Sequence, residues 1–549
     1  MRFRDEPVDE PVDDDDDVEL PVRSVCGSHR ERLPWALLGV GELVFLLSFA
    51  VYMVVPFFPL PVWCLVLGAL LACAPFAWIR RCAPSKRCRR HALRVGAAVL
   101  VLNGALAIVV AVAWWSPLGH AFSLASQLCV VGLGHVDTSS ARLVVRCPRA
   151  DRVRAHAWRA GASVNVTSDW AELKSAIGCS VVLPLSSLEA DADFEYQLEF
   201  DNLVGGAPTS DSGSFRTAPA LGSAASHQFR FTFGSCLLPA VFENLSRIDE
   251  IRRQNSSFML FLGDFVYLDQ PHPELSQRRS NVELKYIEVL ADKNVIESRR
   301  FMPWHVIYDD HEIHDNWDEP DSTTLYQTAI NEVWFNWLAV GNPASPIAGE
   351  YFYSFRRGEA CFFVLDTRRH RSPASMPAND TSKSMLGAAQ LEALKTWLRE
   401  SNSVAAQCVV KFVATSVPFT TLFQKQDSWH GFRSERQAII DFIVAHDITG
   451  VVMLSGDTHT AFAVETQLSA NLTLYDFSAS PIDGTWFPSS PLGDSRDSQT
   501  VLGKFAASDY WGTVDVDTSD ADVGRVTVHF DAGLDKRVFS KTIEIAKKL

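Results

Sequence analysis

Six short apolar runs alternate with amphipathic stretches from His227 onward, and this alternation restricts the possible folds more than any other feature. The runs are "FRFTFGSC", "FMLFLGD", "MPWHVIYDD", "ACFFVLDTR", "CVVKFVATS" and "ITGVVMLSGD". Between them lie stretches with helical periodicity, such as "GAAQLEALKTWLRE" and "SERQAIIDFIVAH". Continuous apolar strands are typical of a sheet that is covered on both faces. The pattern therefore predicts an α/β domain over about residues 225–549.

Five of the six runs end on side chains that can bind metal. These residues are Cys236, Asp264, Asp309, Asp310, His311, Glu312, Asp366, Asp457 and His459. A single Asp after a strand is more often a helix cap or a turn residue. Ligands of α/β sheets bind beyond the carboxyl ends of the strands, however, so five such ends together favour a site. The set could hold two metal ions bridged by one carboxylate, an arrangement that activates water and neutralises a phosphoryl transition state.

The densest of these ends, "YDDHEIHDNW" at residues 308–317, does not fit a zinc protease. The H-E-x-x-H motif requires two histidines at i and i+4 on one helix. His311 and His314 are only three residues apart. Oxygen ligands suit Ca²⁺, Mg²⁺, Mn²⁺ or Fe³⁺, while imidazole and thiolate suit iron or zinc.

The N-terminal part of the chain has a different character. Residues 1–33 form an acidic, apolar-poor segment that is predicted to be a disordered tail. Residues 34–115 contain three apolar runs, each long enough to cross a bilayer, and we expect three transmembrane helices there.

The short loop "RRCAPSKRCRRHALR" between the second and third runs is strongly basic. Such loops stay in the cytoplasm, which predicts a cytoplasmic N-terminus and places the chain beyond about Ser116 outside the cell or in a lumen. Five glycosylation sequons are compatible with this topology: Asn165, Asn244, Asn255, Asn379 and Asn471. The same part holds six cysteines whose pairing the sequence does not assign: Cys129, Cys147, Cys179, Cys236, Cys361 and Cys408.

Residues about 120–220 read as short alternating strands separated by turn-rich pieces, which predicts a small β-sandwich. The segment "LEADADFEYQLEF" resembles the tyrosine corner of fibronectin type III and immunoglobulin-like domains. Tyr196 would be its corner residue, or else an ordinary strand aromatic.

The segments "FTFGSC", "LFLGDFVYLD", "IYDDHEIHDNW", "FFVLDTRRHR", "DSWHGF" and "LSGDTHTAF" occur in this order. The series resembles that of the PhoD-like alkaline phosphatases, a branch of the calcineurin-like metallophosphoesterases, over about residues 125–485. The resemblance implies a two-sheet β-sandwich core flanked by helices, preceded by the small β-sandwich. The three predicted transmembrane helices are not part of the family pattern.

The resemblance also implies a set of metal ligands: Cys236, Asp264, Tyr267, Asp309, Asp310, Asp457 and His459. Asp264 would bridge two or more metal ions, with Fe³⁺ and Ca²⁺ expected and other divalent metals possible. Cys236 and Tyr267 would complete the iron site, although each could instead be a buried core residue. Asp310 would bind the second metal with support from Asp309.

Two further residues receive catalytic roles by the same resemblance. His311 would protonate the leaving oxygen or hold the phosphate. Arg368, with Asp366, would support the site or bind phosphate; the alternative is an arginine–aspartate pair that holds a loop in place. Glu312 and His314 receive no role. Ser416 stands where many members of the superfamily have a histidine, so one metal would have fewer protein ligands.

The predicted function is a membrane-anchored phosphatase or phosphodiesterase that hydrolyses phosphate esters with a metal-bound hydroxide. The alternative is a non-catalytic membrane receptor or scaffold that uses the same fold for binding. A transporter is disfavoured because three spans are few and contain no paired carboxylates. The net charge of −15 opposes general nucleic-acid binding, and no G-x-x-x-x-G-K-[ST] segment suggests the use of ATP.

Overall fold

The computed structural model describes residues 124–548 apart from residues 160, 162–164, 209, 239–244, 271–277, 485–491 and 507. These residues belong to the second of the two compact units of the chain, Val112–Leu549. The predicted acidic tail and the three predicted transmembrane helices lie outside the described residues. Within the described ranges, no helix combines the length and the apolar character that a membrane span requires.

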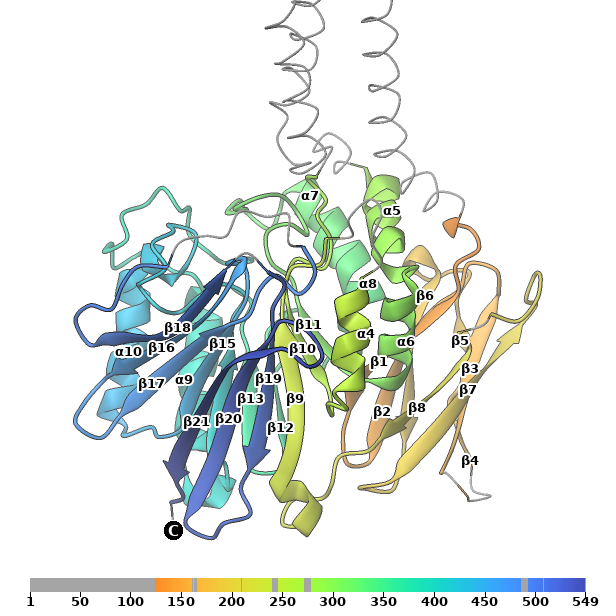
Figure 1. The fold of residues 1–549 in the computed structure, drawn as a ribbon. Coiled ribbons are helices and arrows are strands. Elements are labelled where there is room, and N and C mark those ends of the chain that lie inside the picture. The colour runs from red at the N-terminus through yellow and green to blue at the C-terminus, as the bar shows by residue number, and fades with distance from the viewer. Residues whose placement is uncertain are drawn as a thin grey trace, which may run out of the picture. The chain divides into compact units, whose positions relative to one another are not determined.

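The first described domain is a small β-sandwich (Figure 1). One sheet contains β1 (Val130–Val136), β2 (Ser140–Arg146) and β6 (Ser180–Ser186), in that order. The other contains β3 (Arg152–Arg159), β4 (Asn165–Thr167), β5 (Ala171–Glu172), β7 (Asp193–Asp201) and β8 (Ser212–Arg216). Alternating apolar residues of both sheets meet in one core. A sandwich therefore lies where the alternating pattern predicts one.

Tyr196 does not make the local bond that defines a tyrosine corner. The corner hydroxyl bonds to the backbone a few residues upstream. Here the Tyr196 hydroxyl donates to the backbone carbonyl of Arg300 at 3.1 Å. Arg300 belongs to α6 (Lys293–Phe301) of the following domain. Tyr196 therefore ties the sandwich to its neighbour.

Two facing sheets form the second domain (Figure 1). The strands of the first sheet are β9 (Gln228–Gly234), β10 (Met259–Leu262), β11 (Trp304–Ile307), β19 (Trp511–Asp517), β20 (Val523–Asp531) and β21 (Arg537–Ala546). Those of the second are β12 (Tyr353–Arg357), β13 (Ala360–Val364), β14 (Val410–Ala414), β15 (Val451–Ser455), β16 (Thr460–Gln467), β17 (Thr473–Ser478) and β18 (Gln499–Ala506). Their orders are β11-β10-β9-β19-β20-β21 and β12-β13-β14-β15-β17-β16-β18.

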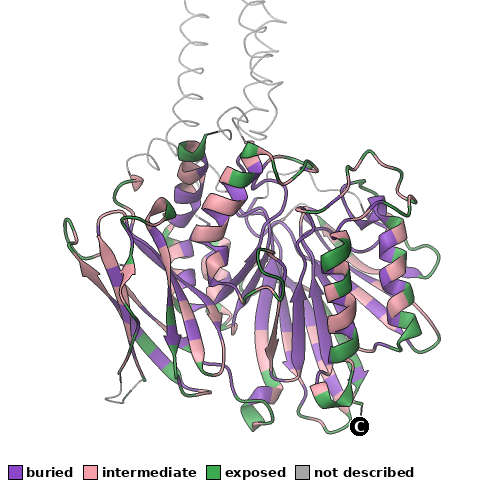
Figure 2. Ribbon diagram, turned by 180° about the vertical axis from the view of Figure 1, so that it is seen from behind, coloured by how far each residue is buried: buried purple, intermediate pink, exposed green. Residues whose placement is uncertain are grey.

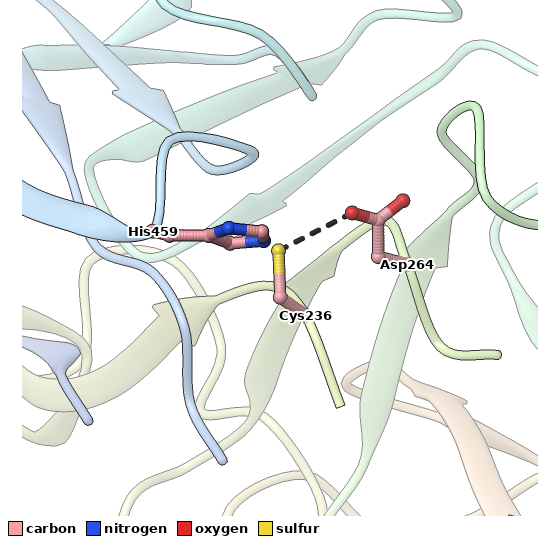
Figure 3. Close-up of side chains that lie close together, drawn as sticks. All are labelled: Cys236, Asp264 and His459. Atoms are coloured by element: carbon pink, nitrogen blue, oxygen red, sulfur yellow. Dashed lines mark hydrogen bonds between the residues drawn. The ribbon is translucent and has the colours of Figure 1, made fainter. Parts of the chain in front are cut away.

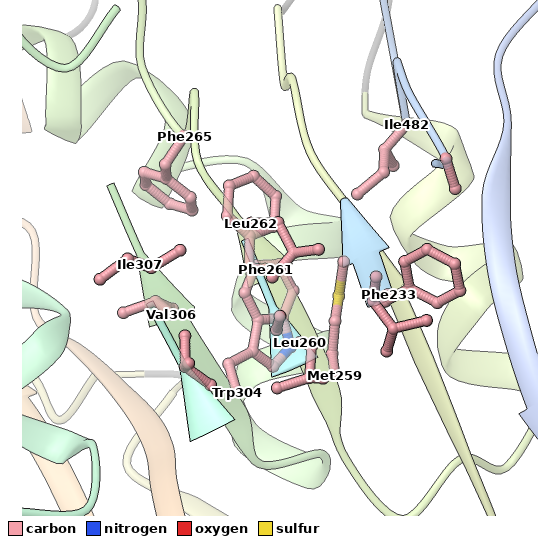
Figure 4. Packing of buried hydrophobic residues seen from close by; sticks show 14 of the residues in the cluster. Phe233, Met259, Leu260, Phe261, Leu262, Phe265, Trp304, Val306, Ile307 and Ile482 are labelled. Atoms are coloured by element: carbon pink, nitrogen blue, oxygen red, sulfur yellow. The ribbon is translucent and has the colours of Figure 1, made fainter. Parts of the chain in front are cut away.

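Aromatic side chains join the two sheets. The ring of Phe231 on β9 lies edge-on to Phe362 of β13 and Phe412 of β14, with ring centroids 5.3 and 5.1 Å apart. Apolar side chains of β9, β10 and β11 pack together, including Phe233, Phe261 and Trp304 (Figure 4). Because β10, β11 and β13 are buried along their whole length, their continuous apolar sequences are explained by burial on both faces.

Helices cover the outer faces of the sheets. The helices α9 (Gly387–Ser401) and α10 (Arg433–Ala445) pack on the second sheet, and α4 (Ser246–Arg253), α5 (Arg279–Leu290) and α6 pack with the first. A further helical segment consists of α7 (Thr324–Tyr326), a π-helical stretch at Gln327–Trp334 and α8 (Phe335–Trp337). The strands of both sheets are largely buried, whereas exposed residues gather on the helices and loops (Figure 2). The predicted two-sheet core flanked by helices is thus confirmed.

The central strands direct their carboxyl ends to one edge. The strands β9, β10 and β11 are mutually parallel, as are β13, β14, β15 and β17. The two sheets meet at this edge, because the Asp457 backbone N–H, just after β15, donates to Ser235 Oγ, just after β9, at 2.9 Å. The donor-rich ends predicted from separate strands therefore converge.

Four of the six cysteines in the part of the chain beyond Ser116 form two disulfides. Cys129 is bonded to Cys147 in the small sandwich, and Cys361 to Cys408 in the second domain. Among the described residues, Cys179 and Cys236 are free thiols.

Candidate metal centre

Three groups of ligating side chains meet at the shared edge of the two sheets. Within each group the ligand atoms lie within 4.8 Å of one another. The groups are Cys236–Asp264–His459, Asp264–Asp310–His311 and Asp264–Asp309–Asp310–Asp457. Asp264 is the one residue common to all three. A carboxylate in this position can contact two adjacent cations, as predicted for the bridging ligand.

The backbone at these residues is unusual. Cys236, Asp264, Asp457 and His459 all have positive φ values, between 48° and 67°. Such conformations cost about 1–3 kcal/mol per residue and persist where the surroundings impose them, often at active sites. Directly before Asp264, Gly263 has φ of 106°, and a Cβ there would lie 2.4 Å from the Asp309 Cβ. The backbone conformations of the turns after β9, β10 and β15 therefore direct these side chains toward one another.

Cys236 lies in polar surroundings although it is fully buried. Its thiol donates to Asp264 Oδ2 at 3.3 Å and receives a hydrogen bond from Ser480 Oγ at 3.0 Å. Figure 3 shows Cys236, Asp264 and His459 converging from three separate loops. Burial, with the Asp264 carboxylate nearby, raises the pKa of the thiol well above its ordinary value. The geometry favours the ligand interpretation of Cys236 over that of a simple core residue.

Tyr267 reaches the same group. Its hydroxyl donates to Asp264 Oδ2 at 3.3 Å and lies 3.4 Å from His459 Nε2. Its ring packs against that of His311 with centroids 4.3 Å apart. The phenolic oxygen therefore lies beside a sulfur, a carboxylate and an imidazole, which is the donor set predicted for an iron-like metal.

The carboxylate group on the other side of Asp264 has the chemistry of a cation site. Asp309 Oδ2 and Asp310 Oδ1 are buried and have no hydrogen-bond partner. Burial and the neighbouring carboxylates raise the pKa values of Asp264 and Asp457 well above the ordinary value. Since crowded carboxylates repel one another, bound cations would relieve this cost. The residues present therefore fit the metal ions that the sequence predicts.

His311 is oriented by a carboxylate that carries no assignment from the sequence. Its Nδ1 lies 2.9 Å from Asp269 Oδ1, and its backbone N–H donates to Asp264 Oδ1 at 3.4 Å. Burial lowers the pKa of His311, but Asp269, Asp310 and Asp264 together raise it well above the ordinary value. An imidazolium held in this way can donate a proton, which is the chemistry that the predicted role would require. Asp269 follows Asp264 by five residues in the same loop.

Arg368 is a buried member of an ion network. Its side chain is fully buried and forms a bidentate pair with Asp427, with N–O distances of 2.9 and 2.8 Å. It also donates to Asp309 and to the Trp317 carbonyl. These contacts favour the supporting interpretation of Arg368 over direct phosphate binding. Asp427 comes from the "DSWHGF" segment.

Asp366 is placed away from the ligand groups. Its carboxylate accepts hydrogen bonds from the Tyr308 hydroxyl and from the backbone N–H groups of Arg368 and Arg369. Asp366 therefore holds the loop after β13 in place. It does so through the backbone amides of Arg368 and Arg369, and not through an ion pair with the Arg368 guanidinium.

Three remaining residues of the motifs have distinct surroundings. Ser416, two residues after the end of β14, donates to Asp309 Oδ1 at 2.7 Å. His314 lies 3.6 Å from Glu319 and takes part in none of the three ligand groups. Glu312, which the sequence leaves without a role, is fully buried and accepts hydrogen bonds from three backbone amides.

Comparisons with known proteins agree with this geometry. The model of the PhoD-like phosphatase family matches residues 235–524. Alkaline phosphatase D of Bacillus subtilis (strain 168) is 23% identical over 332 residues, 53% of this chain and 55% of the relative. The chain thus spans about half the length of this curated relative.

Two solved structures share the fold. A structure of PhoD has a TM-score of 0.57 at 18% identity, over 75% of this chain and 92% of that chain. The purple acid phosphatase PPD1 from yellow lupin (Lupinus luteus) seeds has a TM-score of 0.52 at 12% identity, over 75% and 73%. The family match covers more than half of the chain and contains every predicted ligand, so this chain belongs to the PhoD-like phosphatase family.

Proposed function

We propose that this chain is a metal-dependent phosphoesterase that hydrolyses phosphate mono- or diesters. The observation that carries the proposal is the position of Asp264, whose carboxylate belongs to all three ligand groups at the shared edge of the sheets. A carboxylate shared in this way could hold two adjacent cations, the arrangement by which many phosphatases stabilise the attacking and leaving oxygens.

Each side of Asp264 would hold a different kind of metal. Cys236, Tyr267 and His459 supply a thiolate, a phenolate and an imidazole, which suit Fe³⁺. Asp309, Asp310 and Asp457 supply only oxygen, which suits Ca²⁺ or another hard divalent ion. When bound, such ions would supply Lewis acidity toward the phosphoryl group and lower the pKa of water.

The protein's own groups would orient the ester and move the proton. His311, held by Asp269, would donate a proton to the leaving oxygen. Arg368 would hold the Asp309 carboxylate in place through its pair with Asp427. Asp457 and His459 are partly exposed, so the phosphate would enter from their side.

We also propose that the protein is anchored in a membrane with its phosphatase domain outside the cytoplasm. The apolar runs in residues 34–115 and the basic loop between two of them support this topology. The disulfides Cys129–Cys147 and Cys361–Cys408 add independent support, because disulfides persist mainly in oxidising compartments.

The test is a substrate panel on the full chain purified in detergent. Nitrophenyl and alkyl phosphate monoesters and diesters are assayed before chelation, after chelation and after metal is restored. We expect hydrolysis of at least one class, loss on chelation and recovery with iron plus calcium. A protein that binds metal but hydrolyses no ester would instead support the non-catalytic receptor.

A further inference from the structure

Glu312 joins the two loops that carry the central carboxylates. Its Oε2 accepts hydrogen bonds from the backbone N–H groups of Asp264, at 2.9 Å, and Asp309, at 2.8 Å. Its Oε1 accepts one from Phe265. The first loop follows β10 and the second follows β11. One side chain therefore fixes both loops.

The two loops need such a connection because they lie in close contact and the backbone of the first is strained at Asp264. Asp264 has φ of 57° and Gly263 has φ of 106°. A Cβ at Gly263 would lie 2.4 Å from the Asp309 Cβ, so the chains touch with no room for a side chain. Three buried N–H groups at this contact would lack partners without Glu312, and each unsatisfied amide costs about 1–3 kcal/mol.

Glu312 does not itself belong to the ligand groups. Its side chain is fully buried, and both oxygens already accept amide hydrogen bonds. Its effect on the site must therefore pass through Asp264 and Asp309.

We propose that Glu312 is a positioning residue that sets the separation between the Asp264 and Asp309 carboxylates, and so the spacing of the two metal positions. This inference rests on the proposed function. Residues that orient metal ligands from behind commonly change metal affinity by roughly 10–100-fold when they are replaced.

The geometry requires that both side-chain oxygens of Glu312 accept hydrogen bonds. An ionised carboxylate only accepts hydrogen bonds, whereas a glutamine amide offers one acceptor and one donor. In Glu312→Gln the carbonyl can serve the Asp264 and Asp309 amides, but the NH₂ group then faces the Phe265 N–H. Two donors would oppose each other at the loop contact, while the shape of the side chain stays the same.

Glu435 provides a matched control. It is also buried, and its carboxylate accepts hydrogen bonds from the Met385 and Leu386 amides and from the Ser384 hydroxyl. Its contacts join α10 to the loop before α9. Glu435→Gln therefore disturbs a comparable clamp that touches none of the ligands.

The experiment compares the full-chain wild type, Glu312→Gln and Glu435→Gln by metal titration and by hydrogen exchange of the amides around Asp264, Phe265 and Asp309. For Glu312→Gln we expect faster exchange at these amides and a rise in the dissociation constant for Ca²⁺ or Fe³⁺ of about tenfold or more. For Glu435→Gln we expect wild-type values for both, even if its unfolding temperature falls.

Equal metal affinity and equal exchange in Glu312→Gln and the wild type would overturn the inference. So would an equal loss of affinity in both variants, because a general loss of stability would then explain it. If Glu312→Gln does not fold, Glu312→Asp gives the same readouts, since it keeps both acceptors but shortens the clamp by one methylene. Wild-type affinity in that variant would also overturn the inference, whereas a wild type that binds metal without hydrolysing esters contradicts only the proposed function.

Discussion

The two histidines of the site differ in what holds them. His459 Nε2 lies near the Tyr267 hydroxyl and belongs to the group with Cys236 and Asp264. The Nδ1 of His311 lies 2.9 Å from Asp269 Oδ1, although His311 also belongs to the group with Asp264 and Asp310. A ligand and a proton donor should respond differently to removal.

We expect His311→Ala to retain its metal and to slow alkyl phosphate esters by about 10²–10⁴, the usual contribution of a general acid. Nitrophenyl esters should be much less affected, because their leaving oxygen is already a stable anion. His459→Ala should lose metal and slow both esters alike. Metal content and rates of both variants on both esters are the measurement. If His311→Ala empties a metal position or slows the two esters equally, the acid role is wrong.

At the scale of elements, the loops after β10 and β11 lie in close contact within the site. Gly263→Ala would place a methyl group 2.4 Å from the Asp309 Cβ in a left-handed backbone. We expect the free energy of unfolding to fall by more than the roughly 1–2 kcal/mol of the backbone conformation alone, and metal binding to weaken. Gly349→Ala is the control, because Gly349 has φ of 84° and a methyl group there would have no neighbour within 4 Å. Denaturant unfolding and metal titration of both variants should separate the cost of the backbone conformation from the cost of the steric contact with Asp309. Equal losses of unfolding free energy and of metal affinity in the two variants would contradict the tight contact.

The strands and the residues at their ends could be predicted from the sequence because the signals are local. A run such as "FMLFLGD" shows both a buried strand and the carboxylate that follows it. Glu312, Asp269 and Asp427 could not be assigned, since each acts on a group 42–59 positions away. The corner interpretation of Tyr196 is wrong for the same reason, because its partner Arg300 lies in another domain. Contacts between residues so far apart in the chain leave no periodic pattern in the sequence.

At the scale of the whole molecule, the membrane topology stays a prediction that N-glycosylation of exposed asparagines can test. Asn255, Asn379 and Asn471 are exposed in the described structure and lie in sequons, so an extracytoplasmic domain could carry glycans on them. Expression in a glycosylating host should give a mass that glycosidase reduces, and Asn471→Gln should remove one part of the shift. Protease access to the domain only from the cytoplasmic side would contradict the topology.

The pairing of the C-terminal strands with the first sheet is visible only in the whole fold. The antiparallel strands β19, β20 and β21 extend the first sheet beyond β9, although some 280 residues separate β9 from β19 in the chain. The sequence beyond residue 485 carries no motif that predicts this pairing. The matched family region ends at residue 524, within β20.

The most direct test of the central claim is the metal content of Asp264→Asn. If the Asp264 carboxylate is shared by two cations, its replacement should lower the occupancy of both metals together, in a protein that remains folded. Activity should then fall far more than tenfold. Equal metal content in the variant and the wild type, with activity within roughly tenfold or about 1.4 kcal/mol of barrier, would contradict the shared carboxylate.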